Sequence, residues 1–321
     1  MQTRASKQGR LNADRRQLMQ KWFKAFYQQR YLHVFVLPAV IFLIIFKFVP
    51  IAGLQIAFKD YSFRKGISGS PWAGLKHFEQ LVMDVTLWPA VKNTLLISIS
   101  KLLIGFPIPI VFAILMNEMR LTRLKRTLQT ISYFPHFIAY SVVALMLSNL
   151  LSINGVLNTL LTGIGIIEKP KLFLGDPDAF LWIAVLTDIW KTTGWNSIIY
   201  FAALTSVSPE LYEAATIDGA NRLQRILNIT LPSILPTIVM LWILRVGSIT
   251  TGANFDLSYL LANNLNRTGT EILPTYVLKT GISLGRFSYA TAVGFIQSLV
   301  SLFLVFGANL VSNKLSGEGL F

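Results

Sequence analysis

Four charged side chains lie deep inside stretches of this chain that are otherwise apolar: Lys101, Asp188, Lys191 and Arg245. A charge in the hydrocarbon core of a bilayer is costly, so such residues normally face a bundle interior or a watery cavity and mark a functional site. All of them except Asp188 are cations. Because an excess of embedded cations is tolerated where an anion passes, this set favours an acidic substrate. The alternative is that some of these cations pair with acids of a partner chain.

The stretch at residues 180–207 also carries side chains that suit a carbohydrate. An aromatic face packs against a sugar ring, while amide, hydroxyl and charged groups bond its hydroxyls. Asp188, Lys191 and Trp195 are spaced by three and four residues and therefore share one face of a helix. An alternative stays open, in which Asp188 forms a purely structural salt bridge with Lys191 or Arg245. The candidate substrate pathway consists of Asp188, Lys191, Trp195, Asn196, Tyr200 and Arg245.

A polar loop at about residues 207–232 separates two long apolar runs. Ser208 is a typical N-cap, Pro209 is tolerated in a first helical turn, and Glu210 suits the positive end of the helix dipole. Gly219 lets the chain leave the helix in a backbone conformation that a side chain would penalise. The loop therefore predicts a short helix that projects out of the bilayer, with two adjacent alanines on which another protein can lie close.

The elements that must position these residues are membrane-spanning helices. Hydrophobic residues make up 53% of the 321 residues, charged residues 14%, and the mean hydropathy is +0.54, values outside those of an ordinary soluble domain. A helix needs about 20 apolar residues to span a bilayer. The chain is therefore predicted to be an all-α integral membrane protein with six transmembrane helices, at about residues 32–58, 90–116, 128–151, 180–207, 232–251 and 289–311.

The distribution of basic residues predicts the orientation. Residues 1–30 carry eight Lys and Arg against one acid, and the short segment from Arg120 to Arg126 carries four more. Because cytoplasmic segments are enriched in Lys and Arg, both termini and the polar loop are expected in the cytoplasm. Residues 1–30 are expected to form a separate basic segment, either solvated or folded as an interfacial helix, and residues 31–321 a transmembrane domain.

Several function classes are excluded by composition and spacing. The formal net charge is +14, but the basic residues are concentrated next to spans, which argues against nucleic acid. There is no cysteine, and His33, His77 and His136 lack ligand spacing, so no metal site is expected. No nucleotide-binding motif or cluster of catalytic acids and bases is present. Uphill transport would thus need energy from a partner or from an ion gradient.

The polar loop has a longer pattern, in which Glu213-Ala214-Ala215 is followed after three residues by Gly219 and after nine more by Ile229-Thr230-Leu231-Pro232. This spacing resembles the EAA loop of ABC importer permeases. The resemblance implies that the loop forms a coupling helix, which docks into a cleft of a separate ATPase subunit. The residues assigned to that contact are Glu213, Ala214, Ala215, Asp218, Gly219 and Ala220.

The resemblance covers about residues 31–311 and is to the oligosaccharide branch of these permeases. It implies a type I-like importer fold and, as substrate, an oligosaccharide of the alginate or pectin type. Residues 252–256 depart from the glycine- and phenylalanine-rich form expected there. The segments that carry the resemblance are residues 53–63, 72–75, 133–135, 189–195 and 287–294.

The partners that the resemblance implies are a second homologous permease in a heterodimer, two ATPase subunits, and an extracytoplasmic solute-binding protein. ATP and magnesium would bind the ATPase subunits, and this chain would hold no cofactor. The location implied is the bacterial cytoplasmic (inner) membrane, as a multi-pass protein. The alternative is an ion-coupled secondary transporter, which would need coupling carboxylates and repeat symmetry, whereas Asp188 is the single embedded acid.

Overall fold

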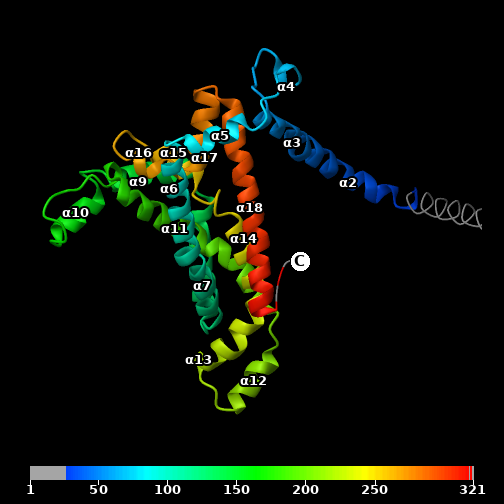
Figure 1. Cartoon of the computed structure of the whole chain (residues 1–321). Helices are drawn as coiled ribbons and strands as arrows, with labels where there is room; N and C mark the ends of the chain where they lie inside the picture. Colours follow the sequence, from blue (N-terminus) through cyan, green and yellow to red (C-terminus); the bar gives the residue numbers. More distant parts are fainter. Residues whose placement is uncertain (1–26, 318, 320–321) are drawn as a thin grey trace, which may run out of the picture. The chain divides into compact units, whose positions relative to one another are not determined.

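The computed structural model describes residues 27–317 and 319, and within them the regular structure is helical (Figure 1). One isolated antiparallel bridge, between Lys59 and Trp72, lies among these helices. The chain divides into two compact units. Of the described residues, one unit holds 27–56 and Ser62–Ser70, and the other holds Ala57–Tyr61 and 71–317 with 319.

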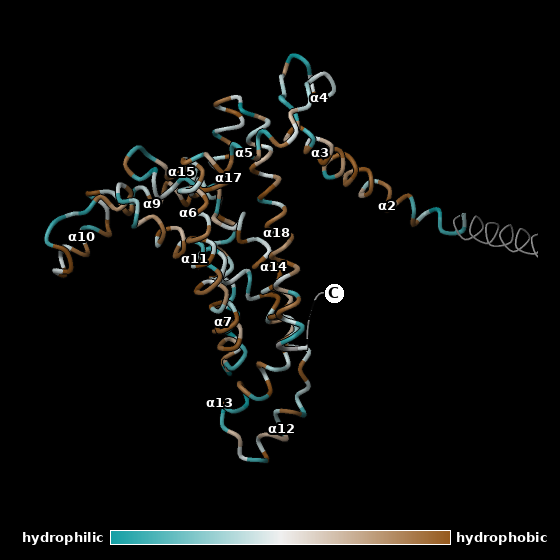
Figure 2. Tube along the Cα trace, in the orientation of Figure 1, coloured by the Kyte–Doolittle hydropathy of each residue, from teal (hydrophilic) through white to brown (hydrophobic). Residues whose placement is uncertain are grey.

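The first unit holds most of a continuous helical run from Arg30 to Phe58, whose last two residues belong to the second unit. None of the residues of its first helix is buried, and its course is hydrophobic along most of its length (Figure 2). The span predicted at 32–58 is confirmed as a helix long and apolar enough to cross a membrane. The bounds are α2 (Arg30–Leu43), η1 (Ile44–Phe48), α3 (Val49–Ile51), η2 (Ala52–Phe58) and α4 (Gly66–Gly69).

The basic segment predicted at residues 1–30 lies outside the described residues up to position 26. Its interfacial helix therefore stays a prediction.

Three further helices of the second unit are long and apolar enough to span a membrane: Leu87–Asn117, Arg222–Gly247 and Phe287–Lys314. They correspond to the spans predicted at 90–116, 232–251 and 289–311. The helix that was expected to begin at residue 232 begins ten residues earlier. Pro232 does not interrupt it, because the proline lies in the first turn of α14, directly after the π-helical turn η6.

The bounds of these three runs are α6 (Leu87–Ser100), η3 (Lys101–Gly105) and α7 (Pro107–Asn117); α13 (Arg222–Arg225), η6 (Ile226–Thr230) and α14 (Leu231–Gly247); and α18 (Phe287–Ser316).

The segment predicted as a span at 128–151 is divided into two helices by a sharp bend. The structure places α8 (Thr122–Tyr133) with η4 (Phe134–Phe137) before a sharp break, and α9 (Tyr140–Leu150) after it, with a bend of 96°. Pro135 lacks an amide proton for the helical ladder, and the residues that follow η4 are extended, with ψ of 127° at Ile138 and 143° at Ala139. The two halves are one broken span or a re-entrant segment.

The helix predicted at 180–207 is α11 (Pro177–Thr205), whose 29 residues rise about 44 Å, more than the hydrocarbon core of a bilayer. Its polar and charged side chains exclude it from the helices that qualify as spans by composition. Ten of its residues are buried, Asp188 and Lys191 among them. Helix α11 is therefore the central helix of the second unit, packed against α7 and α14.

The remaining helices cover the two ends of the second unit. Helices α15 to α17 lie at one end, beside α5, and α12 lies at the opposite end (Figure 1). The bounds are α5 (Lys76–Met83), α10 (Val156–Gly163), η5 (Phe173–Gly175), α12 (Pro209–Ile217), α15 (Phe255–Leu261), α16 (Arg267–Thr270), α17 (Leu273–Leu278) and η7 (Lys279–Ser283).

Candidate functional site

Helix α12 begins and ends by local backbone signals. Pro209 occupies its first turn, and Ser208 stands at the N-cap with an extended backbone but makes no side-chain capping bond. At the other end Gly219 has φ +77°, and the amide of Ala220 donates to the carbonyl of Ala215 at 2.8 Å. The amide of Gly219 donates to Thr216 at 3.1 Å, which completes a Schellman motif. The glycine is needed for its positive φ.

The surface of α12 is open. No residue of the helix is buried, and Ile217 is 87% exposed. Among the residues assigned to a partner contact, Glu213, Ala214 and Asp218 are exposed, while Ala215 is half-buried. A short helix that exposes apolar side chains at the tip of a bundle presents a surface suited to another protein.

Two side-chain contacts connect α12 to the helix that follows. The hydroxyls of Tyr212 and Thr230 lie 3.0 Å apart, and the guanidinium of Arg225 donates to the hydroxyl of Thr216 at 3.0 Å. Asn221 starts α13 with a capping box. Thr230 immediately precedes the long helix α14, so this contact joins α12 to the bundle.

A buried charge cluster lies in the middle of the second unit. One carboxylate oxygen of Asp188 lies 2.9 Å from the ammonium of Lys101, and the other lies 3.4 Å from a guanidinium nitrogen of Arg245. Asp188 is 6% exposed and Lys101 3%. The Lys101 ammonium also donates to the carbonyl of Gly252 at 3.0 Å. Among the residues that the structure describes, the cluster holds two cations and one anion, so one positive charge has no counter-ion within it.

That surplus charge faces a cavity of about 250 Å³ between α7, α11 and α14. The side chain of Arg245, 37% exposed, is part of its wall, together with Asn196 and Tyr200. Three of the six residues predicted for the substrate pathway thus line one cavity, and Asp188 lies directly behind Arg245. A guanidinium, an amide and a phenol can together bind a carboxylate and hydroxyl groups.

Lys191 and Trp195 are brought together elsewhere, at the break between α8 and α9. The buried Lys191 ammonium donates to the carbonyls of Pro135 at 3.0 Å, His136 at 2.8 Å and Ile138. The ring of Trp195 is stacked on that of His136, with centroids 4.4 Å apart. The Lys191 ammonium thus satisfies backbone carbonyls at the break, and Trp195 packs against a side chain of the same segment. Neither of them lines the cavity at Arg245.

The spacing argument therefore placed Asp188 and Lys191 on one helical face but did not identify their partners. The structural salt bridge left open for Asp188 is formed with Lys101 and Arg245, and not with Lys191.

Three positions at these sites were not singled out from the sequence. Gly252 supplies a carbonyl to Lys101. Asn254 has φ +57° and its side chain accepts from the amide of Leu257, starting α15. A Cβ at Gly194 would collide with the carbonyl of Ser132, so that glycine permits the close crossing of α8 and α11. The departure from the family pattern at residues 252–256 could have drawn attention to Gly252 and Asn254. The position of Gly194 between Lys191 and Trp195 could have drawn attention to that glycine.

Comparison with known proteins gives a consistent result. The family described as "Binding-protein-dependent transport system inner membrane component" matches residues 105–317. The "Polygalacturonan/rhamnogalacturonan transport system permease protein YteP" of Bacillus subtilis (strain 168) is 43% identical over 92% of this chain and 91% of its own length. "Protein LplB" of the same organism is 40% identical over 94% of each chain.

Two solved structures have the same fold. A chain of a bacterial ABC transporter involved in the import of the acidic polysaccharide alginate has a TM-score of 0.83 and 37% identity, over 92% of this chain and 99% of that chain. A chain of a bacterial alginate ABC transporter in complex with an alginate pentasaccharide-bound periplasmic protein has a TM-score of 0.84 and 36% identity, with the same coverage.

Proposed function

Because this chain belongs to the family of binding-protein-dependent transport system inner membrane components, we propose that it is the permease subunit of an ATP-driven importer for acidic oligosaccharides. The observation that carries the choice of an acidic substrate is the surplus cation Arg245 in the wall of the central cavity. The names of the pectin-type relative and of the alginate transporters support the same choice. The family assignment also sets aside the ion-coupled secondary transporter.

We propose six spans with both termini in the cytoplasm, in a bacterial inner membrane. The fourth span is α11 and the third is the broken pair of α8 and α9. Residues 31–321 form the permease domain, preceded by the basic segment 1–30. The topology can be tested by labelling.

Because the chain has no cysteine, a single cysteine introduced at a chosen position is the only thiol that can react. A cysteine at Asn264 should react with an impermeant maleimide outside sealed cells, and one at Asp218 should not. The reverse pattern would refute the topology.

The coupling surface of the proposal is α12 with the turn after it. Glu213, Ala214, Ala215, Gly219 and their neighbours would be received by one of two ATPase subunits, which bind ATP and magnesium. A second, homologous permease would complete the membrane part, and a solute-binding protein would deliver the sugar. The open surface of α12 and its contacts with Arg225 and Thr230 support this role.

The substrate pathway of the proposal is narrower than the set derived from the sequence. Asn196, Tyr200 and Arg245 would contact the sugar, and Asp188 would orient Arg245 from behind. Lys191 and Trp195 would instead hold the bend beside the pathway, since the Lys191 ammonium bonds its carbonyls and the Trp195 ring stacks on His136. A carboxylate of the substrate would then meet a guanidinium whose geometry is set before binding.

The test uses the assembled complex in proteoliposomes with its loaded binding protein. Arg245→Met leaves Asp188 paired with Lys101, so the variant should fold and keep its basal ATPase activity. Uptake of galacturonate or mannuronate oligomers should fall at least tenfold, and uptake of a neutral oligomer should not fall. Lys76→Met, which removes a surface cation paired with Asp60, is the matched control. Unchanged uptake by Arg245→Met, or a wild-type preference for neutral oligomers, would refute the acidic-sugar assignment.

A further inference from the structure

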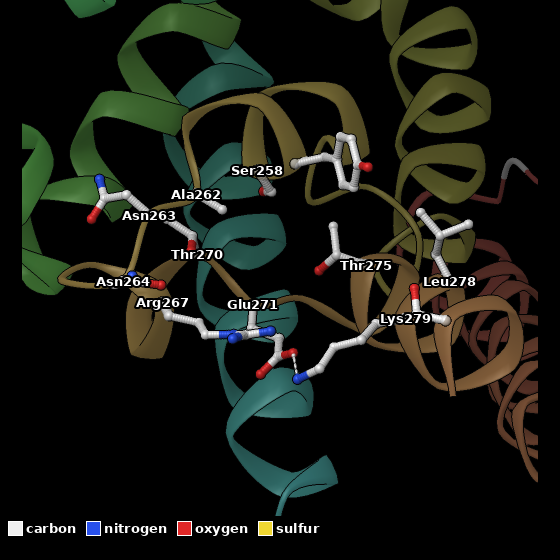
Figure 3. Close-up of a pocket in the computed structure, with 12 residues that line it drawn as sticks. Ser258, Ala262, Asn263, Asn264, Arg267, Thr270, Glu271, Thr275, Leu278 and Lys279 are labelled. Atoms are coloured by element: carbon white, nitrogen blue, oxygen red, sulfur yellow. Dashed lines mark hydrogen bonds and ion pairs between the residues drawn. The ribbon is translucent and has the colours of Figure 1, made fainter. Parts of the chain in front are cut away.

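A second polar pocket, of about 320 Å³, lies among α15, α16, α17 and η7 (Figure 3). These helices lie at the end of the second unit opposite α12 (Figure 1). Most of the residues in the wall of the pocket have polar or charged side chains, unlike those around the cavity at Arg245. The residues that matter are Tyr259, Asn264, Arg267, Glu271, Thr275 and Lys279. In the proposed topology this end faces outward, before the pathway begins.

The walls of the pocket are held by side-chain amides. Asn266 is fully buried, and its amide donates to the carbonyls of Leu174 at 2.8 Å and Leu261 at 3.0 Å. The amide of Asn93, from α6, donates to the carbonyls of Thr268 at 2.7 Å and Glu271 at 2.9 Å. These bonds fix α16 on both sides. The pocket is therefore preformed, which lowers the entropic cost of binding a small ligand.

Two cations of the pocket differ in their pairing. Lys279 forms an ion pair with Glu271 at 3.0 Å. Arg267 is exposed and has no carboxylate within 4.0 Å in the part of the chain that the structure describes. A guanidinium without a counter-ion at the wall of a preformed pocket can take a carboxylate in two parallel hydrogen bonds. The pocket is thus suited to an anion of small size.

An aromatic face completes the pocket. Tyr259 is 57% exposed, and its ring is stacked on Phe255 with centroids 5.5 Å apart and planes 12° apart. The stack holds the phenol in one orientation at the wall. The aromatic face can pack against a sugar ring, and the neighbouring guanidinium and amides can bind the carboxylate and hydroxyls of that ring.

We propose that this pocket is an outer subsite for the uronate end of an oligosaccharide, separate from the cavity at Arg245. Arg267 binds the carboxylate and the ring of Tyr259 packs against the sugar, while Lys279 neutralises the carboxylate of Glu271 at the same wall. The inference rests on the proposed import of acidic oligosaccharides, because a neutral sugar gives Arg267 no counter-ion. The subsite would retain the sugar as it leaves the binding protein.

The test is equilibrium binding of radiolabelled trigalacturonate to the full complex in nanodiscs, without the binding protein. The Arg245→Met background removes binding at the central cavity. In that background, Arg267→Met should weaken binding at least tenfold, since a bidentate charge-assisted contact is lost. Arg267→Lys should weaken binding less, because the positive charge remains although the two parallel hydrogen bonds of the guanidinium are lost. Lys76→Met is the matched control for a cation outside the pocket, and methyl-esterified trigalacturonate should bind weakly in every variant.

The outcomes separate this inference from the proposed function. A complex whose loaded binding protein never drives uronate import refutes the proposed function itself. Normal wild-type import with no pocket binding, or with equal binding by wild type and Arg267→Met, overturns the subsite alone. Arg267→Met that weakens attachment of the sugar-free binding protein would show a protein docking surface instead, and would also overturn the subsite.

Discussion

The loop at 207–232 and the charge cluster of Lys101, Asp188 and Arg245 are both polar regions in an apolar chain, but they are built differently. The loop is continuous in sequence, exposed, and shaped by the conformation of Pro209 and Gly219. The cluster is assembled from three helices and is largely buried. Changing an exposed local element mainly alters what it contacts, whereas changing a buried charge leaves its partners without compensation.

This contrast predicts that the two regions fail in opposite ways. Variants in the loop should give a folded permease that no longer couples to its ATPase. Variants of Asp188 should give a permease that does not assemble.

The largest effect is expected for Asp188→Ala. The change leaves Lys101 and Arg245 without an anion, and breaking a buried pair in this way typically costs about 3–5 kcal/mol. The yield of folded complex and its melting temperature in detergent should both fall. The double variant with Lys101→Met should recover part of the lost stability, because one of the two cations left without an anion is removed. A single variant as stable as wild type would show that the cluster is hydrated rather than buried.

Gly219→Val should have a smaller effect on stability and a large one on coupling. A β-branched side chain at φ +77° costs roughly 1–2 kcal/mol, and the Schellman motif that ends α12 would be distorted. The complex should fold, but substrate-stimulated ATPase activity and import should be lost together. Gly219→Asn is the matched control, since asparagine tolerates this conformation. Normal import and normal substrate-stimulated ATPase activity in Gly219→Val would show that this turn is not part of the ATPase contact.

Tyr212→Phe tests whether the loop acts on the bundle through its contact with Thr230. The change removes one hydrogen bond of 3.0 Å, worth about 1 kcal/mol, without altering packing. Transport per ATP hydrolysed should decline, while docking of the ATPase persists. Tyr61→Phe, which removes a hydroxyl at the other end of the unit, should change neither quantity. If Tyr212→Phe and Tyr61→Phe transported the same amount of substrate per ATP hydrolysed, the loop would serve only to dock the ATPase.

The smallest effect concerns a third polar group, around Asp84. Burial alone would raise the pKa of Asp84, but hydrogen bonds from Thr86, Tyr289 and Tyr276 outweigh it and hold the pKa well below its usual value. A depressed pKa contributes stability that is present above about pH 4 and is lost as the pH falls towards the folded-state pKa.

Tyr289→Phe removes a 2.7 Å bond to this carboxylate and should lower stability by about 1 kcal/mol at neutral pH. The difference in melting temperature between wild type and variant should narrow as the pH is lowered from 4 towards 2, where Asp84 of the variant takes up its proton before that of wild type. A constant difference over that range would mean that Asp84 is not the group that titrates.

The helical class, four of the spans and the bounds of the polar loop could be predicted from sequence because each depends on neighbouring residues. Hydropathy over about 20 residues marks a span, and a proline and a glycine mark the ends of α12. The break in the predicted third span was missed. Pro135 signalled a disturbance, but a bend of 96° depends on Lys191 reaching the exposed carbonyls from another helix.

By itself, then, the sequence determined which segments are apolar, where α12 starts and stops, and that charges are embedded. Only the tertiary structure decided which charges meet. Asp188 and Lys191 share a helical face, yet Asp188 is paired with Lys101 and Arg245, and Lys191 binds the backbone at the break. The physical reason is that backbone conformation and hydropathy are local properties, whereas the partner of a side chain is set by the packing of helices distant along the chain.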